Sequence, residues 1–439
     1  MLGGGSAAEA FVAALRRLDE KVPITLTERA LVGGECTYWA CMPSKTLLRA
    51  PELLAAARLT PGATEAVAAA LDVDRVFWWR DQVVDGWKDS GHEPWLLDRG
   101  VQLLRGKAHV AAPGVCVVDG EELPYDKLVV ATGSTPAVPP LPGVDEVERW
   151  TTMDATSSHE LPGSLIVLGG GAAGCELAQL YRRLGAEVTL VQRGGRLLPR
   201  VDPEAAALVE QAFEEEGITV RLGAAIERVE ASDRGVRVLF SDGSDTEAER
   251  LLVATGRIPN VEKLGLEALG VTTGRDGIKV DEYLAAGDDV WAIGDVTGIA
   301  LFTHVAKYQG RVAAANVAGQ RRRADYRAVP AVLFTDPQVA QVGTVEGEGL
   351  VSASWPVERT SRSSTYERPK RTGFVKLVAD PGRGVLVGAV AVGPEAGEWL
   401  QQATLAVRAE VPVDVLRDTI QPFPTFSEAI HFAARDLPL

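Results

Sequence analysis

The sequence predicts an α/β protein with two doubly wound parallel-sheet domains, followed by an α+β domain at its C-terminal end. Residues 1–29 and 163–193 support the first part, because each combines a glycine-rich turn, an amphipathic helix and a β-branched strand. From about Tyr326 the pattern changes to antiparallel-type strands followed by two helices. A chain of 439 residues is also too long for one compact domain.

Composition limits the possible classes of protein. The chain is 46% hydrophobic and 24% charged, and no apolar run reaches the roughly 18–20 residues needed to span a bilayer. No basic and apolar leader is visible, and four cysteines in so long a chain are not a disulfide scaffold. These features predict a cytoplasmic protein. The net charge of −15, without a basic block, argues against a nucleic-acid partner, and the lack of a long apolar run predicts no membrane partner.

Both glycine-rich turns fit the pattern G-x-G-x-x-[G/A]. In this pattern, backbone N–H groups and the positive end of a helix face a pyrophosphate. Two copies, each followed by a helix and a strand, predict two Rossmann-like dinucleotide sites. The fingerprint residues are Gly3, Gly5 and Ala8 in the first copy, and Gly169, Gly171 and Gly174 in the second.

The residue that ends the second strand of each copy is expected to bind the adenosine ribose. In the first copy it is Glu28, a carboxylate suited to two ribose hydroxyls. In the second copy it is Gln192, followed by Arg193. Without a carboxylate there is no repulsion of a 2′-phosphate, and the arginine could pair with one. This favours NADPH over NADH.

Three further segments place a glycine just after an apolar strand, where a ligand can approach the backbone. They contain Thr132 and Gly133, then Gly256, then Gly294 and Asp295. Asp295 could accept hydrogen bonds from a sugar-like chain. A purely structural role for Asp295 would be that of a helix or turn cap.

Together these motifs resemble those of the flavin-dependent pyridine nucleotide-disulfide oxidoreductases, which include dihydrolipoamide dehydrogenase, glutathione reductase and mercuric reductase. The resemblance covers essentially the whole chain, including C-x4-C-x-P-S-K at residues 36–45 and FPTFSE at residues 423–428. It implies FAD at the first glycine turn and a nicotinamide nucleotide at the second. It also implies a C-terminal dimerisation domain.

Cys36 and Cys41 lie five residues apart and so do not share a face of a regular helix. A bridge between them needs an irregular turn before a helix that begins near Pro43. Cys41 would then lie just ahead of the positive helix end, which stabilises a thiolate. By the resemblance, Cys41 exchanges electrons with flavin and Cys36 attacks the substrate. A zinc site would need two further ligands, so no metal is expected, and a pair of inert thiols stays possible.

The resemblance also assigns roles to residues near these cysteines. In the family, residues at the positions of Lys45 and Glu176 form an ion pair near the reacting flavin nitrogen. Both are therefore candidate catalytic and cofactor-binding residues, although charges on a helix surface would give the same pattern. Gly34 joins the candidate FAD-binding residues.

The expected domain boundaries follow these motifs. Residues 1–145 are predicted to form the first part of the FAD-binding domain and residues 146–260 the NAD(P)-binding domain. Residues 261–325 return to the FAD-binding domain, and residues 326–439 form the interface domain of a homodimer.

The chain departs from the family at its start. Only Met1 and Leu2 precede the first glycine turn, where a central strand is expected. We expect this to expose the two neighbouring strands and to weaken FAD binding. A start codon assigned too late is the favoured explanation.

A second departure lies near the end. Disulfide reductases of the family carry a histidine before the proline, supplied by the other subunit, and a glutamate that orients it. Here Phe423 takes that place, while Glu428 is kept, although Thr425-x-x-Glu428 also reads as a helix capping box. Phe423 cannot relay a proton and should raise the pKa of Cys36. The bulky Tyr38 and Trp39 are expected to narrow access to Cys36.

The sequence thus predicts a homodimeric FAD enzyme whose active site is shared across the subunit interface. Electrons would pass from NADPH or NADH through flavin to the Cys36–Cys41 disulfide, and then to an unidentified small-molecule or disulfide acceptor. Mercuric ion is a disfavoured acceptor, because mercuric reductases carry an extra pair of C-terminal cysteines and no cysteine follows Cys175 here. Phe423 leaves open a C–S cleaving enzyme similar to 2-ketopropyl coenzyme M oxidoreductase/carboxylase. A flavin-direct quinone reductase with non-participating cysteines and a FAD-poor dimeric binding protein are also compatible with the sequence.

Overall fold

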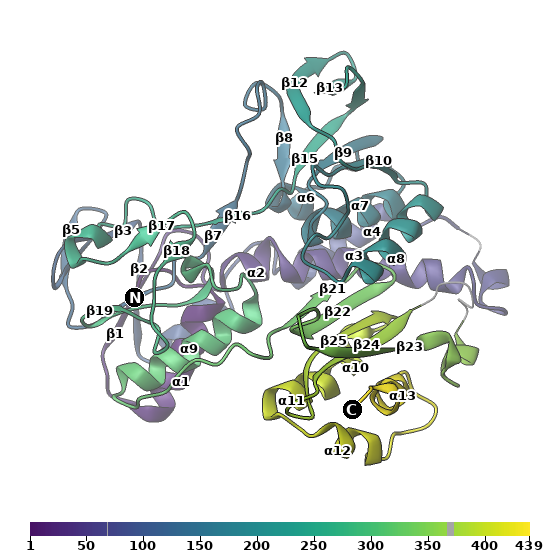
Figure 1. Cartoon of the computed structure of the whole chain (residues 1–439). Helices are drawn as coiled ribbons and strands as arrows, with labels where there is room; N and C mark the ends of the chain where they lie inside the picture. Colours follow the sequence, from purple (N-terminus) through teal and green to yellow (C-terminus); the bar gives the residue numbers. More distant parts are fainter. Residues whose placement is uncertain (68, 367–372) are drawn as a thin grey trace. The chain divides into compact units, whose positions relative to one another are not determined.

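The computed structural model describes residues 1–67, 69–366 and 373–439. The chain divides into two compact units (Figure 1). Unit 1 comprises residues 1–44, 78–137 and 256–325, and unit 2 comprises residues 45–77, 138–255 and 326–439. The finer boundaries expected from the sequence remain a prediction.

Unit 1 is built on a sheet that receives the first glycine turn. In one half, β1 (Ile24–Glu28) pairs in parallel with β2 (Val101–Arg105). In the other half, β6 (Leu128–Val130) pairs in parallel with β20 (Val290–Ala292), which pairs antiparallel with β19 (Ala285–Gly287).

Leu2 joins these two halves. It forms parallel bridges to Thr27 of β1 and Val130 of β6, and it is 2% exposed. Leu26 and Val130 are fully buried. The exposure of the neighbouring strands expected from the short start is therefore not seen at these positions, because the two residues before the glycine turn already pair with both strands.

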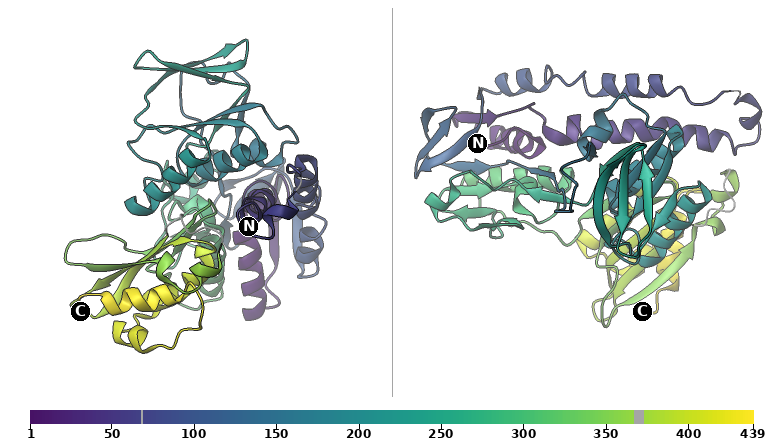
Figure 2. Two further views of the ribbon diagram at one scale, coloured as in Figure 1. Left: turned by 90° about the vertical axis from the view of Figure 1, so that its right-hand side faces the viewer. Right: turned by 90° about the horizontal axis from the view of Figure 1, so that it is seen from above.

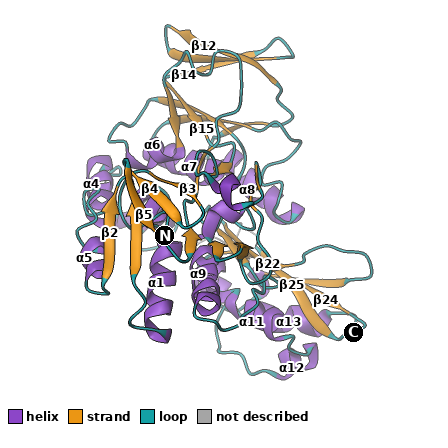
Figure 3. Cartoon of the chain, turned by 90° about the vertical axis from the view of Figure 1, so that its left-hand side faces the viewer, coloured by secondary structure: helices purple, strands orange, loops and turns teal. Residues whose placement is uncertain are grey.

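Helices α1 (Ser6–Leu18) and α9 (Thr303–Val317) lie side by side in unit 1 (Figure 3). They approach closely because Gly310 has no side chain: a Cβ there would lie 2.5 Å from the Ala7 carbonyl oxygen. Unit 1 also contains two short helices, α2 (Gly34–Tyr38) and α5 (His92–Leu97), and the start of α3 (Cys41–Ala57). Its further strands, all antiparallel, include β3 (Ala108–Ala112), β4 (Val115–Val118) and β5 (Glu121–Pro124), the pair β7 (Ser134–Pro136) and β16 (Arg257–Pro259), and the pair β17 (Thr273–Gly274) and β18 (Gly277–Ile278).

Unit 2 contains the second glycine turn in a five-stranded parallel sheet. Its strand order is β11 (Thr219–Arg221), β10 (Glu187–Val191), β9 (Ser164–Leu168), β15 (Arg250–Val253) and β8 (Arg149–Thr151). Helix α7 (Ala172–Leu184) connects β9 to β10, as the sequence pattern predicts. Helix α8 (Pro203–Glu215) and the antiparallel strands β12 (Ile226–Ser232), β13 (Gly235–Phe240) and β14 (Asp245–Ala248) follow.

The C-terminal part of unit 2 is an antiparallel sheet with helices packed on one face (Figures 1 and 2). The strand order is β21 (Pro330–Leu333), β22 (Gln338–Gly343), β25 (Val385–Gly393), β24 (Phe374–Asp380) and β23 (Val351–Pro356). Of the helices, α11 (Gln401–Ala409) contacts β22 and β25, and α13 (Glu428–Asp436) contacts β23 and β24. Two helices were expected after these strands, and the described residues also contain α12 (Val413–Asp418), between α11 and α13.

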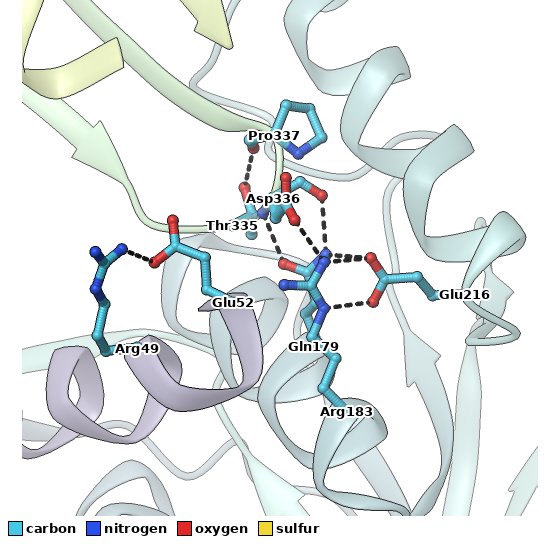
Figure 4. Close-up of polar contacts among 8 residues, drawn as sticks. All are labelled: Arg49, Glu52, Gln179, Arg183, Glu216, Thr335, Asp336 and Pro337. Carbon is cyan, nitrogen blue, oxygen red and sulfur yellow. Dashed lines mark hydrogen bonds and ion pairs between the residues drawn. The ribbon is translucent and has the colours of Figure 1, made fainter. Parts of the chain in front are cut away.

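An ion network of largely covered side chains, 11–14% exposed, ties this sheet to α7 within unit 2 (Figure 4). The Arg183 guanidinium lies 2.6 Å from a Glu216 carboxylate oxygen and 2.7 Å from one of Asp336. Gln179 accepts the Asp336 N–H at 2.8 Å and donates to the carbonyl oxygen of the same residue at 2.9 Å. Burial alone would lower the pKa of Arg183, but Glu216 and Asp336 outweigh it and raise that pKa. The arginine therefore stays charged.

The predicted fold class is confirmed: two nested Rossmann-like domains and a C-terminal α+β domain. Among the helices that the structure describes, none combines the length and apolar character needed to cross a membrane.

Candidate active site

The first glycine turn forms a backbone cradle at the start of α1. Gly3 has φ +97°, and a Cβ there would overlap the Ala131 carbonyl oxygen. A Cβ on Gly34 would lie 2.8 Å from Gly5 Cα, so only glycine lets these two loops meet. At Gly5 an added Cβ would meet only Gly34 Cα, at 3.8 Å, among the described residues. The space beside the Gly5 backbone, just ahead of a helix N-terminus, fits the pyrophosphate of FAD.

The second turn has the same construction. Gly169 has φ +111°, and a Cβ there would lie 2.5 Å from the Ala254 carbonyl oxygen. A Cβ on Gly174 would overlap the Gly169 carbonyl oxygen. Around Gly171, however, no atom of the described residues lies within 4 Å of an added Cβ. The same backbone approach is therefore open to a second dinucleotide.

Glu28 and Gln192 occupy matching positions in the two copies. Glu28 accepts the Gly4 N–H at 2.7 Å, and Gln192 accepts the Gly170 N–H at 3.1 Å through its amide oxygen. Both side chains thus fix the glycine turn beside them. The difference is that Gln192 offers an N–H₂ donor where Glu28 offers only acceptors. Arg193, next in the chain, is exposed.

The cysteine pair lies at a break between two helices in unit 1. Cys36 is in α2, Cys41 is the first residue of α3, and Trp39 and Ala40 separate the helices. The helix therefore starts two residues earlier than Pro43 suggested. All four cysteines of the chain are thiols in this structure. Cys41 Sγ lies 3.3 Å from the hydroxyl oxygen of Thr303, at the start of α9.

The environment of Cys36 keeps its proton in place. A hydrogen bond with Cys41, then burial and the charge of Cys41, raise the pKa of Cys36 far above its usual value. The Thr303 hydroxyl and the Lys307 ammonium act in the opposite direction. The expected rise in the pKa of Cys36 thus has a cause within unit 1 that is independent of Phe423.

Tyr38 does not lie where the sequence suggested. Its side chain is 1% exposed, and its ring packs against Trp39 and in T-shaped contact with His92. Tyr38 therefore points into the protein and does not narrow access to Cys36. Trp39 is partly exposed and remains a candidate for that role.

The segments around Thr132 and Gly256 are tied together by hydrogen bonds. The Thr132 hydroxyl donates to the Asn260 carbonyl oxygen at 2.7 Å, and the Asn260 amide donates to the Thr132 carbonyl oxygen at 2.8 Å. Gly133 and Gly256 both have positive φ, at +71° and +142°. Each glycine thus ends its strand in a turn that other residues adopt only with strain.

Asp295 is held by residues that the sequence analysis did not single out. Its carboxylate accepts the Ser134 hydroxyl at 2.6 Å, and Arg257 donates to the same hydroxyl oxygen at 2.7 Å. Arg257 also forms an ion pair with Glu35. In the sequence, the signal for these three residues is only that each adjoins a motif already described. Gly294, before Asp295, donates its N–H to Gln309 at 2.6 Å.

In unit 2, Lys45 and Glu176 form an ion pair, with Lys45 Nζ 2.6 Å from Glu176 Oε2. The other oxygen of Glu176 accepts the Phe334 N–H at 2.9 Å. Lys45 Nζ also lies 4.8 Å from the centre of the Phe334 ring. Phe334 was not predicted from the sequence, because its contact with Glu176 joins positions 158 residues apart.

The C-terminal motif also lies in unit 2. Phe423 is 73% exposed, and a Glu428 carboxylate oxygen accepts the Thr425 N–H at 3.4 Å. Helix α13 begins at Glu428, preceded by Ser427, so Glu428 is its first residue. The suggested capping box is therefore not formed with Thr425 as N-cap: the carboxylate reaches back, but the Thr425 hydroxyl donates to the Pro422 carbonyl oxygen instead.

Metal ligands do not gather around these residues. Across residues 1–67, 69–366 and 373–439, no group of three or more His, Cys, Asp or Glu side chains could hold a metal ion.

Comparison with known proteins places the whole chain in one family. Residues 1–320 match the family described as pyridine nucleotide-disulphide oxidoreductase, and residues 329–434 match the dimerisation domain of the same family. Mercuric reductase of Staphylococcus aureus is 34% identical over 443 residues, which are 98% of this chain and 81% of that protein. Dihydrolipoyl dehydrogenase 2 of Haloarcula marismortui is 34% identical over 453 residues, covering 99% and 95% of the two chains.

Solved structures agree. LpdA from Mycobacterium tuberculosis superimposes with a TM-score of 0.87 at 28% identity, covering 99% of this chain and 98% of that one. The HOCl-induced flavoprotein disulfide reductase RclA from Escherichia coli gives a TM-score of 0.87 at 25% identity over the same shares. The chain belongs to the pyridine nucleotide-disulfide oxidoreductases, a family of flavoproteins that use FAD and NAD(P)H and carry a disulfide redox centre.

Proposed function

We propose that this protein is an NADPH-dependent flavoprotein that passes two electrons through the Cys36–Cys41 pair to a small-molecule acceptor. The observation that carries this proposal is the cluster of Cys36 in α2, Cys41 at the start of α3 and the Thr303 hydroxyl at the start of α9. Bound FAD supplies the two-electron chemistry between the nicotinamide and the thiols. The proposed site is completed in a homodimer, which the match to the dimerisation domain supports, and the proposed location is the cytoplasm.

Cys36 and Cys41 have different roles after the disulfide is reduced. Reduction of a Cys36–Cys41 disulfide takes up two electrons and leaves one thiolate and one thiol when a single proton is added. Cys41 carries the charge, because it starts α3 and contacts the Thr303 hydroxyl. Cys36 keeps the proton, which it must release before it can attack an acceptor.

Release of that proton limits the choice of acceptor. In relatives that reduce disulfides, the resemblance gives this task to a histidine where this chain has Phe423. Lys307 and Thr303 favour ionisation of Cys36 but do not outweigh its burial and its bond to Cys41. We therefore infer slow turnover with ordinary disulfides such as lipoamide and glutathione disulfide.

The nucleotide preference rests on the second glycine turn. Gln192 holds the turn through its amide oxygen and leaves its N–H₂ group to donate. Arg193 adds an exposed positive charge beside it. At both positions a 2′-phosphate would meet a hydrogen-bond donor in place of a carboxylate, which favours NADPH.

Anaerobic titration with NADPH tests the proposal. Two electrons should be consumed before the flavin bleaches, while a long-wavelength thiolate-to-flavin absorption grows in. Variants with Cys36→Ser and Cys41→Ser should bleach from the first addition. If both variants turn over fully with a quinone and no disulfide-dependent activity is found, the cysteines are spectators and the proposal fails. Lipoamide, glutathione disulfide, mercuric ion and quinones form the panel that identifies the acceptor.

A further inference from the structure

We propose that Glu35 and Arg257 are a positioning pair that holds Cys36 in place relative to the flavin-binding carboxylate Asp295. Glu35 directly precedes Cys36 in the short helix α2. Arg257 begins β16, which pairs with β7 beside Asp295. This inference rests on the proposed redox role of Cys36 and the proposed FAD contact of Asp295.

The ion pair has two-point geometry. Arg257 Nη1 donates to Glu35 Oε1 at 2.7 Å, and Nη2 donates to Oε2 at 2.5 Å. Parallel bonds of this kind fix the orientation of both planes as well as the distance between them. The side chains of Arg257 and Glu35 are 25% and 20% exposed, so solvent weakens the pair only in part.

The same Arg257 guanidinium also contacts Ser134, which is hydrogen-bonded to Asp295. Its Nε donates to the Ser134 hydroxyl oxygen at 2.7 Å, and Nη2 donates to the Ser134 carbonyl oxygen at 2.9 Å. The Ser134 hydroxyl in turn donates a hydrogen bond to Asp295 Oδ2 at 2.6 Å. Glu35, Arg257, Ser134 and Asp295 therefore form one continuous chain of hydrogen bonds.

Helix α2 needs such an anchor. It is five residues long, and no side chain caps its N-terminus at Gly33. So short a helix is not held by its own hydrogen bonds. Arg257 fixes the residue next to Cys36, which raises the effective concentration of the Cys36 thiol at Cys41 and favours their disulfide. Arg257 also balances the negative charge of the Glu35 carboxylate beside Cys36.

The thiol–disulfide equilibrium of the FAD-loaded protein tests this role without using turnover. Samples are equilibrated in glutathione redox buffers, and the fraction of oxidised Cys36–Cys41 is read by alkylation and mass spectrometry. Glu35→Gln keeps the shape of the side chain but removes its charge. We expect the disulfide to become about tenfold easier to reduce, which corresponds to about 30 mV for a two-electron couple.

Glu93→Gln is the matched control, because Glu93 pairs with Arg105 elsewhere in unit 1. It should leave the equilibrium unchanged. Arg257→Met should shift the equilibrium like Glu35→Gln and also weaken FAD binding, since Ser134 loses both of its guanidinium bonds. Arg257→Lys keeps the positive charge but cannot form two parallel hydrogen bonds with Glu35. Its thiol–disulfide equilibrium should therefore lie between those of the parent protein and Arg257→Met.

The two proposals fail differently. If Glu35→Gln and Arg257→Lys retain FAD and show the parent equilibrium, the positioning role is wrong and the proposed function stands. If the parent protein forms no Cys36–Cys41 disulfide in any redox buffer, the proposed function itself fails.

Discussion

Lys45 Nζ lies 2.6 Å from one carboxylate oxygen of Glu176, while the other oxygen accepts the N–H of Phe334 at 2.9 Å. The Glu176 side chain is only 7% exposed, against 35% for Lys45. The carboxylate is therefore fully partnered in a site where water reaches mainly the lysine. Any change that removes Lys45 leaves a buried charge with one neutral donor.

Lys45→Met should accordingly lower the free energy of unfolding by about 1–3 kcal/mol, the cost of a buried charged group that loses a partner. Urea denaturation of the FAD-loaded protein measures this. Adding Glu176→Gln to the same protein should restore most of the loss, because no unpaired charge then remains. Equal stability of the parent and the Lys45→Met protein would show that the ion pair contributes nothing.

Arg193→Ala should weaken the use of NADPH selectively. The loss in kcat/KM should correspond to about 1.5–3 kcal/mol, the range for a hydrogen bond to a charged group, with NADH unaffected. Arg200→Ala is the control, since it removes an exposed arginine seven positions further along the chain. Equal use of NADPH and NADH by the unmutated enzyme would contradict the proposed preference.

Phe423→His should raise turnover with lipoamide or glutathione disulfide. An imidazole is no larger than the phenyl ring that it replaces, and a positioned acid–base group supplies roughly 10²–10⁴-fold in rate. Phe423→Leu serves as the control, because it changes the shape without adding a proton carrier. A gain well below tenfold would point to the partly exposed Trp39 as the obstacle instead.

The reduced protein should lose stability as the pH rises above about 8.5, where a thiol of the unfolded chain ionises. Burial, with smaller effects of Glu176 and Glu210, raises the pKa of Cys175. The folded state therefore keeps its proton at a pH where the unfolded state has lost it, which favours unfolding. Cys175→Ala should flatten this decline between about pH 8.5 and about pH 10. Urea denaturation at several pH values, with reductant present, gives the free energy of unfolding of the parent and of the Cys175→Ala protein. An equal decline of this free energy with pH in both proteins would refute the idea.

Arg183→Met should destabilise the protein by roughly 3–5 kcal/mol, because it removes the guanidinium that pairs with Glu216 and Asp336, whose side chains are each only 14% exposed. Figure 4 shows the matched control, the Arg49–Glu52 pair. Its side chains are 46% and 32% exposed, so Arg49→Met should cost about 0–1 kcal/mol. If the two variants lose similar amounts of unfolding free energy, the network around Arg183 contributes no more to stability than a surface ion pair.

The sequence alone determined the local units of the fold. The pattern at residues 163–193 predicted a strand, a glycine turn, a helix and a second strand, and the structure contains β9, α7 and β10 in that order. These elements are readable because their signals lie within about 30 residues: apolar periodicity, glycines and β-branched runs. The same locality limited the prediction after about Tyr326, which named antiparallel-type strands but not their order: β25 lies between β22 and β24 in the sheet.

Contacts between distant positions were decided only by the tertiary structure. Glu35 and Arg257 are 222 residues apart, and Ser134 and Asp295 are 161 apart, so no local pattern pairs them. Tyr38 illustrates the same limit, since its bulk was evident but its direction depends on packing against His92. The sequence determined which segments carry the chemistry, because turns and helices form from neighbouring residues. The tertiary structure decided which side chains hold the thiols in place, because those contacts exist only once remote segments pack together.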